Sequence, residues 1–144
     1  LAPMRMETVR LASGARAIDD TYNANPASLY SALQVLAGMQ GTPWLVLGDM
    51  KELGEDSRKL HAEVGDTARS LGVSRIFAVG EMAAFTVDAF GKGAQHFSNR
   101  SSLVETLKKE LRPGINCLVK GSRSMGMEHV VREVAAPGTL KEAC

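Results

Sequence analysis

The first third of the chain alternates apolar and polar residues and then changes to a helical period. Residues 6–12 and 15–19 show the two-residue alternation of half-buried strands, with a Ser-Gly turn between them. Leucines then recur at i, i+4 and i+7 within residues 26–39, where Asn25 can cap a helix and Pro26 suits its first position. The pattern predicts a β-hairpin followed by an amphipathic helix.

The rest of the chain alternates apolar runs with amphipathic stretches. The predicted strands are residues 44–48, 75–79, 94–97 and 115–119. The predicted helices lie between Ser57 and Gly72, over residues 81–90, over residues 102–111 with Ser101 as the cap, and after Ser122 or Ser124. Strands that alternate with helices predict right-handed crossovers and a mainly parallel sheet. We therefore expect one Rossmann-like α/β domain of three layers, α/β/α. Its sheet should have five to six strands, with the N-terminal hairpin strand antiparallel.

Composition narrows the class of protein further. A chain of 144 residues fits one domain with its own core. The formal net charge of +1 gives no reason to expect nucleic acid or an anionic membrane as a partner. No apolar run approaches the length of a membrane span. The two cysteines, of which Cys117 lies in an apolar run, suit a reducing cytoplasm.

Polar side chains gather at one edge of the predicted sheet. Ligands of open α/β sheets bind beyond the carboxyl ends of the strands, and the loops there are more polar than the opposite connections. The loop after the second strand carries two acids, a phenol and two amides: Asp19, Asp20, Tyr22, Asn23 and Asn25. Later loops carry Asp49 and the segment KGSRS, which begins at Lys120. The sequence therefore predicts a binding site at this edge.

These residue types suit a nucleotide or another anion. A carboxylate such as Asp20 can accept hydrogen bonds from ribose hydroxyls, and amides or a phenol can line a base pocket. The KGSRS segment combines small residues, two cations and a helix start, which favours anion binding. Structural roles compete with these interpretations: Asp19 can cap a helix, Asp49 can bind a cation or an amine or cap a turn, and His61 suits a packed core position.

Several catalytic motifs are absent. The chain has no G-x-x-x-x-G-K-[ST] and no G-x-G-x-x-G segment. No Ser/His/Asp or Cys/His set has positional support, and His96 and His129 have no partners at metal-ligand spacing. We therefore predict no catalytic residue and no metal ligand in this chain, which shows no means of positioning a γ-phosphate with Mg²⁺.

Three segments carry a resemblance to a known family. DDTYNANPASLYSAL, VLGDMKELGEDS and LVKGSRSMGMEHVV, in this order, resemble the C-terminal domain of the Mur ligases, over roughly residues 2–135. They look most like the member that joins D-alanyl-D-alanine to UDP-N-acetylmuramoyl-tripeptide. The resemblance implies that residues 1–7 are a linker and that the N-terminal and central ATPase domains lie outside this chain. We also expect residues 136–144 to form a flexible tail.

The resemblance also implies site residues and a reaction. The full enzyme would use ATP and Mg²⁺ to form an acyl phosphate on the tripeptide, which the amine of D-alanyl-D-alanine attacks. By position, the implied ATP-binding residues are Arg5 at the phosphates, Asp20 at the ribose, and Tyr22, Asn23 and Asn25 beside the adenine. The implied substrate- or anion-binding residues are Asp49, Lys120, Ser122 and Arg123. This chain alone would be inactive, would bind no cofactor tightly, and would belong to the bacterial cytoplasm.

A phospho-receiver signalling domain is the alternative. Receivers also have paired acids after a first strand, a third aspartate and a late lysine, and Asp19, Asp20, Asp49 and Lys120 imitate that set. Asp49, however, follows one crossover too early. The Tyr-Asn-Ala-Asn and Gly-Ser-Arg-Ser segments also have no role in a receiver. A plain scaffold domain would leave the polar edge unexplained, so we favour the ligase domain.

Overall fold

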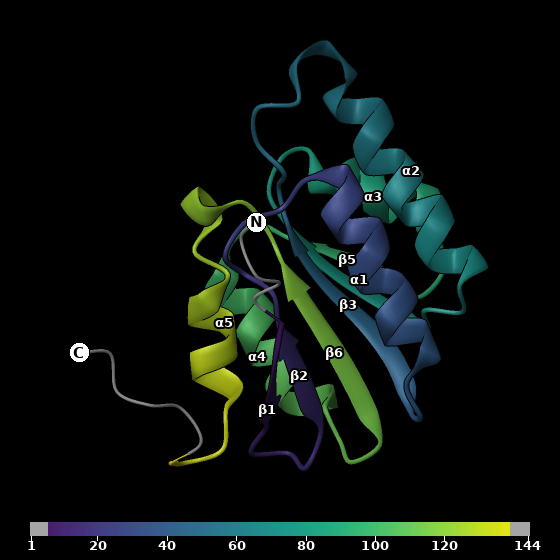
Figure 1. Cartoon of the computed structure of the whole chain (residues 1–144). Coiled ribbons are helices and arrows are strands. Elements are labelled where there is room, and N and C mark those ends of the chain that lie inside the picture. The colour runs from purple at the N-terminus through teal and green to yellow at the C-terminus, as the bar shows by residue number, and fades with distance from the viewer. Residues whose placement is uncertain (1–5, 139–144) are drawn as a thin grey trace.

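The computed structural model describes residues 6–138, which form three layers around a six-stranded sheet (Figure 1). The strands are β1 (Glu7–Arg10), β2 (Arg16–Asp19), β3 (Thr42–Gly48), β4 (Arg75–Val79), β5 (Ala94–Phe97) and β6 (Ile115–Lys120). Their order is β1-β2-β6-β3-β4-β5, and only the β1–β2 pair is antiparallel. The predicted fold class is therefore confirmed, including the antiparallel hairpin.

The helices divide between the two faces of the sheet. They are α1 (Pro26–Gly38), α2 (Ser57–Ser70), α3 (Ala83–Phe90), α4 (Arg100–Glu110) and α5 (Glu128–Val134), with short 3₁₀ helices η1 (Gly54–Asp56) and η2 (Arg123–Met125). Helices α1 and α2 cover one face, and α4 and α5 cover the other (Figure 1). No described helix is long and apolar enough to cross a lipid bilayer.

Alternation along the central strands produces two hydrophobic cores. In β3, Trp44 and Val46 join the core beneath α4 and α5, whereas Leu45 and Leu47 join the core beneath α1, α2 and α3. Successive strand residues point to opposite faces, so a continuous apolar run is required where both faces are covered. Cys117 belongs to the first core, and burial raises the pKa of its thiol to about 12.

Strand β6 lies between β2 and β3, an order that the hydrophobic pattern could not reveal. Val119 aligns with Asp19 on one side and with Val46 on the other. The carboxyl ends of β2, β6 and β3 therefore lie side by side. The loops that follow these three strands, far apart along the chain, meet at one edge of the sheet.

Helix starts depend on cap geometry, and here the predictions were mixed. Asn25 caps α1 as predicted, and its side chain accepts a hydrogen bond from the Ser28 N–H at 2.9 Å. Helix α4 begins earlier than predicted, at Arg100, because Asn99, and not Ser101, is extended and caps it. Ser57 is the first residue of α2 and not its cap.

The last helix also starts later than predicted, because η2 intervenes. Ser122 precedes η2, and Ser124 lies inside it, so neither caps α5.

The two termini fall partly outside the described residues. Residues 1–5 of the predicted linker and residues 139–144 of the predicted tail are not described, while Glu7 belongs to β1. The N–H of residue 136 donates to the Arg10 carbonyl at 3.0 Å.

Candidate functional site

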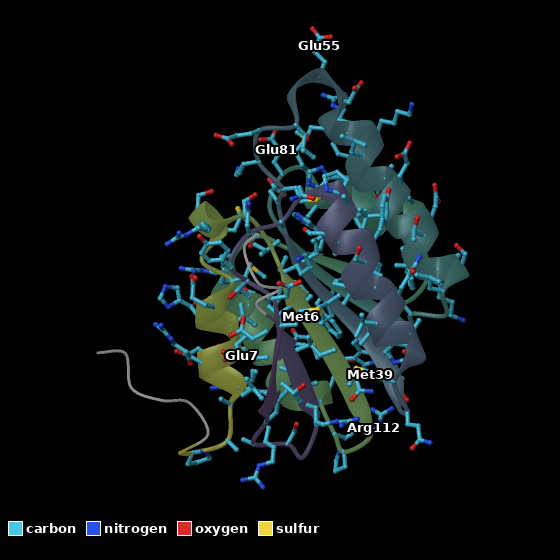
Figure 2. All side chains as sticks on the ribbon, viewed as in Figure 1. Met6, Glu7, Met39, Glu55, Glu81 and Arg112 are labelled. Carbon is cyan, nitrogen blue, oxygen red and sulfur yellow. The ribbon has the colours of Figure 1, made fainter. Side chains whose placement is uncertain are left out.

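The polar edge predicted from the sequence is formed at the carboxyl ends of the strands. Glu55 in η1 and Glu81 in the turn after β4 project beyond that edge, whereas Met39 and Arg112 lie toward the opposite end (Figure 2). At its centre, the Lys120 Nζ donates to Oδ2 of Asp20 at 2.7 Å. The Lys120 side chain is 1% exposed and the Asp20 side chain 13% exposed. Two residues predicted to bind different ligand groups thus form one buried ion pair.

The hydrogen-bond acceptors that Lys120 contacts belong to the protein itself. Its Nζ also donates to the carbonyl oxygen of Asn23 at 3.4 Å. Both contacts lie in the loop between β2 and α1, which is the loop that the sequence analysis assigned to the nucleotide. Of the two members of the ion pair, Asp20 is the one with exposed surface. The strand order explains the pairing, because β2 and β6 are neighbours.

Two exposed side chains from the same two loops also meet. The Arg123 guanidinium lies 5.1 Å from the centre of the Tyr22 ring, a cation–π contact between the loops after β6 and β2. Beside them is a hollow of about 320 Å³. Its lining residues are Tyr22, Asn23, Lys51, Glu52, Ser122, Arg123 and Ser124. Lys51 and Glu52 were not among the predicted site residues, although they follow Asp49 in the same polar loop.

The loop after β3 is held by its neighbours. The Lys51 N–H donates to Oγ of Ser122 at 2.7 Å, and the Ser122 N–H donates to the Asp49 carbonyl at 3.0 Å. Both carboxylate oxygens of Asp49 accept from the start of α3, from the Met82 N–H at 3.2 Å and the Ala83 N–H at 2.8 Å. Of the alternatives left open for Asp49, the capping role matches these contacts.

The capping role of Asp49 makes a stability prediction. Asp49→Ala is expected to lower the free energy of unfolding by about 1–3 kcal/mol, because one buried and one partly buried N–H group lose a charged acceptor. Urea unfolding of this chain measures the change. Asp49→Asn keeps one acceptor oxygen and should lose less, so equal losses in both variants would contradict the capping role.

The comparison with protein families decides the class. The family described as "Mur ligase, glutamate ligase domain" matches residues 4–123. The chain belongs to this family of Mur ligases. The receiver interpretation finds no support among the comparisons.

Relatives of this Mur ligase domain share one name. The UDP-N-acetylmuramoyl-tripeptide–D-alanyl-D-alanine ligase of Escherichia coli is 42% identical over 139 residues, which are 95% of this chain and 30% of that protein. The ligase of the same name from Bacillus subtilis is 32% identical over 91% of this chain and 30% of its own length. The domain thus spans about 30% of the length of these curated relatives.

Solved structures agree on the fold. The MurF ligase of Thermotoga maritima in complex with ADP has a TM-score of 0.79 and 25% identity, with 92% of this chain and 30% of that chain covered. A domain from a Haemophilus ducreyi ligase matches with a TM-score of 0.63 and 15% identity, over 87% of this chain and 94% of that chain. The similarity to that domain, at 15% identity, concerns the fold alone.

Other predicted residues of the Mur ligase domain have structural partners. The Asn25 side chain caps α1, and Oδ1 of Asn23 accepts from the Ala24 N–H at 2.8 Å. His61 is fully buried, as predicted for a packed histidine. Its Nε2 accepts from the Met50 N–H at 3.0 Å, which places the ring proton on Nδ1, next to the Ser57 carbonyl at 2.7 Å. Arg5 lies outside the described residues.

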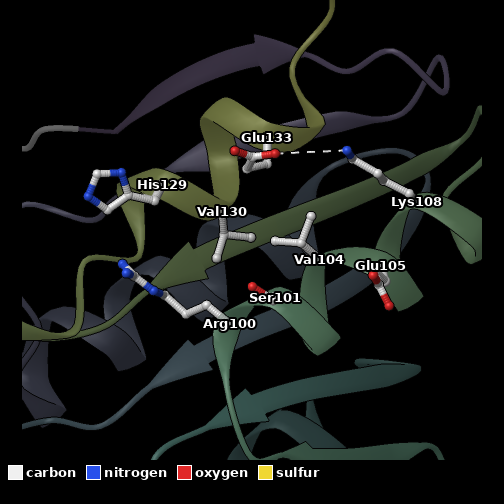
Figure 3. Close-up of a pocket in the computed structure, with 8 residues that line it drawn as sticks. All are labelled: Arg100, Ser101, Val104, Glu105, Lys108, His129, Val130 and Glu133. Atoms are coloured by element: carbon white, nitrogen blue, oxygen red, sulfur yellow. Dashed lines mark ion pairs between the residues drawn. The ribbon is translucent and has the colours of Figure 1, made fainter.

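A larger groove of about 460 Å³ lies between α4 and α5 of the Mur ligase domain (Figure 3). The Arg100 guanidinium at one end donates to the carbonyls of Met125 and Gly126, and Lys108 and Glu133 form an exposed ion pair of 3.9 Å at the other. The residues that line this groove carry both positive and negative charges, and none of them is a predicted site residue. Within residues 6–138, no three His, Cys, Asp or Glu side chains gather as a metal site requires.

Proposed function

We propose that this chain is the C-terminal domain of an ATP-dependent ligase that joins D-alanyl-D-alanine to UDP-N-acetylmuramoyl-tripeptide in the bacterial cytoplasm. The observation that carries the proposal is 42% identity, over 95% of the chain, to the Escherichia coli enzyme of that name. The product would be a peptidoglycan precursor. The polar edge of the sheet supports a part in binding, because open α/β sheets bind ligands there.

In this proposal the loop after β2 holds the nucleoside part of ATP. Asp20 keeps exposed surface beside its ion pair, so a carboxylate oxygen can accept hydrogen bonds from ribose hydroxyls. Tyr22 is 45% exposed and offers a ring beside the adenine. The Thermotoga maritima relative, a structure in complex with ADP, supports a nucleotide as the ligand. Arg5 is proposed to bind the phosphates, and it lies outside the described residues.

The loops after β3 and β6 suit the anionic groups of the reaction. Lys51 and Arg123 bring two exposed cations to the 320 Å³ hollow, where a phosphate or the dipeptide carboxylate could bind them. Asp49 and Ser122 hold these loops in place from within. Mg²⁺ would be held by parts of the longer protein outside this chain, since the described residues assemble no set of ligands.

The proposed reaction requires both this domain and the parts of the enzyme outside this chain. ATP would transfer its γ-phosphate to the terminal carboxylate of the tripeptide. The amine of D-alanyl-D-alanine would then attack the acyl carbon and release phosphate. An acyl phosphate is readily hydrolysed, so the domain's polar edge would serve to cover it and exclude water as well as to bind ATP.

The test compares this chain with the longer protein that contains it. The longer protein is expected to release phosphate from ATP only when the tripeptide nucleotide and D-alanyl-D-alanine are both present, while this chain alone should release none. Product formation by mass spectrometry and phosphate release measure both. Ligation of a different amino acid or dipeptide would overturn the assigned substrate, and turnover by this chain alone would overturn the division of work.

The receiver alternative has its own test. This chain, incubated with acetyl phosphate and Mg²⁺, is expected to take up no phosphate, because the Asp49 carboxylate is buried and accepts two backbone hydrogen bonds. Intact-mass measurement would detect one added phosphate. Its appearance on Asp49 would favour a receiver and contradict the ligase proposal.

A further inference from the structure

Lys120 is fixed more firmly than the loop that it contacts. It is the last residue of β6, a strand with parallel neighbours on both sides. Asp20 and Asn23 lie in the connection between β2 and α1, which has no helix or strand between Asp19 and Pro26. The ammonium therefore ties an irregular loop to the centre of the sheet.

The Lys120 ammonium has little exposed surface and few unused donors with which to bind a ligand. Two of its three N–H donors have protein acceptors, Oδ2 of Asp20 at 2.7 Å and the Asn23 carbonyl at 3.4 Å. Its side chain is 1% exposed, and the ion pair occupies only one carboxylate oxygen of Asp20. A ligand that approaches from solvent can reach the exposed part of Asp20, whereas Lys120 lies behind it.

We propose that Lys120 is a positioning residue that acts through Asp20 and touches neither ATP nor the dipeptide. It holds Oδ2 and so orients Oδ1 toward the ribose hydroxyls before the nucleotide arrives. A carboxylate already held in its binding orientation loses less conformational freedom on binding, which raises affinity. This inference rests on the proposed function, because it takes Asp20 as the ribose acceptor. In the loop after β6, Arg123, which is exposed, is then the residue that contacts an anion.

A double-mutant cycle in the longer protein tests the inference. The variants are Asp20→Asn, Lys120→Met and the two combined, and calorimetry measures the affinities for ADP and for adenosine, which has no phosphate. Asp20→Asn is expected to weaken both ligands by about tenfold or more. Lys120→Met alone should also weaken both by a similar factor. The combined variant should bind like Asp20→Asn, because the residue that Lys120 positions is already lost.

The cycle separates positioning from direct contact and from a general loss of structure. A positioning role leaves the affinity for UDP-N-acetylmuramoyl-tripeptide unchanged, whereas a general structural defect weakens that ligand too. Lys109→Met, which removes an exposed lysine of α4, is the matched control and should change nothing. If Lys120→Met does not fold, the comparison of Asp20→Asn with the combined variant still distinguishes positioning from direct contact. The combined variant has neither charge of the pair, so no buried charge is left unpaired in it.

Two results would overturn the inference in distinguishable ways. A further loss of ADP affinity when Lys120→Met is added to Asp20→Asn would show that Lys120 contacts the ligand directly, and would leave the proposed function intact. If that loss appears with ADP and not with adenosine, the contact is to a phosphate. Unchanged affinity in Asp20→Asn would remove the ribose assignment itself, and the inference with it.

Discussion

Replacing Lys120 by methionine is expected to lower the free energy of unfolding by about 3 kcal/mol. Removing one partner of a buried ion pair leaves the other charge without compensation, which typically costs about 3–5 kcal/mol. The Asp20 side chain keeps 13% exposure, so water can solvate it in part and the lower end of that range applies. Urea unfolding of this chain, with separate determination of midpoint and slope, measures the loss.

Two further variants make that measurement decisive. Lys109→Met is the matched control and should change stability by less than about 0.5 kcal/mol, as exposed substitutions usually do. Adding Asp20→Asn to Lys120→Met should recover part of the loss, because no buried charge then remains unpaired. A loss below about 1 kcal/mol in Lys120→Met, the value typical of a surface pair, would contradict the buried geometry.

Gly65→Ala is the second large expected effect, although it adds only one methyl group. Gly65 lies in α2 where that helix meets α3, and a Cβ there would sit 2.4 Å from the Thr86 carbonyl oxygen and 3.0 Å from the Ala89 Cβ. The helices must separate to admit it. Overpacking of this kind costs about 1–3 kcal/mol, and we expect the upper end because the closest atom belongs to the backbone.

Gly38→Ala is the matched control for that result. Gly38 is the last residue of α1, and a Cβ there would meet nothing within 4 Å. It should leave stability unchanged or raise it by no more than about 1 kcal/mol, since alanine favours the helix over glycine. Thermal unfolding of both variants tests the pair. Equal stability of Gly65→Ala and the parent chain would mean that α2 and α3 do not approach as closely as the structure has them.

The elements of this fold were predictable because each has a clear local period. The strands at residues 75–79 and 94–97 have the predicted bounds. Helix caps were harder, because Asn99 and Ser101 are both good caps and only the extended backbone at Asn99 decides between them. The order of the strands depends on pairing between distant segments, about which the local pattern carries no information.

The candidate site was predictable as an edge, but the contacts within it were not. The rule that ligands bind beyond strand ends selects the loops of Asp20, Asp49 and Lys120 from the amino-acid sequence alone. The rule treats each loop separately, and it therefore assigns Asp20 and Lys120 to different ligand groups. Their ion pair exists because β2 and β6 are neighbours, so it follows only from the strand order.

The central place of β6 also has a consequence for synthesis of the protein. Ribosomes make β6 after the other five strands, yet it pairs with both β2 and β3 and joins the hairpin to the rest of the sheet. Until it emerges, β2 and β3 each have an open edge, and open edges pair readily with other chains. A nascent chain stopped before Ile115 would therefore be prone to aggregate, and the sheet can close only when translation of this domain is nearly complete.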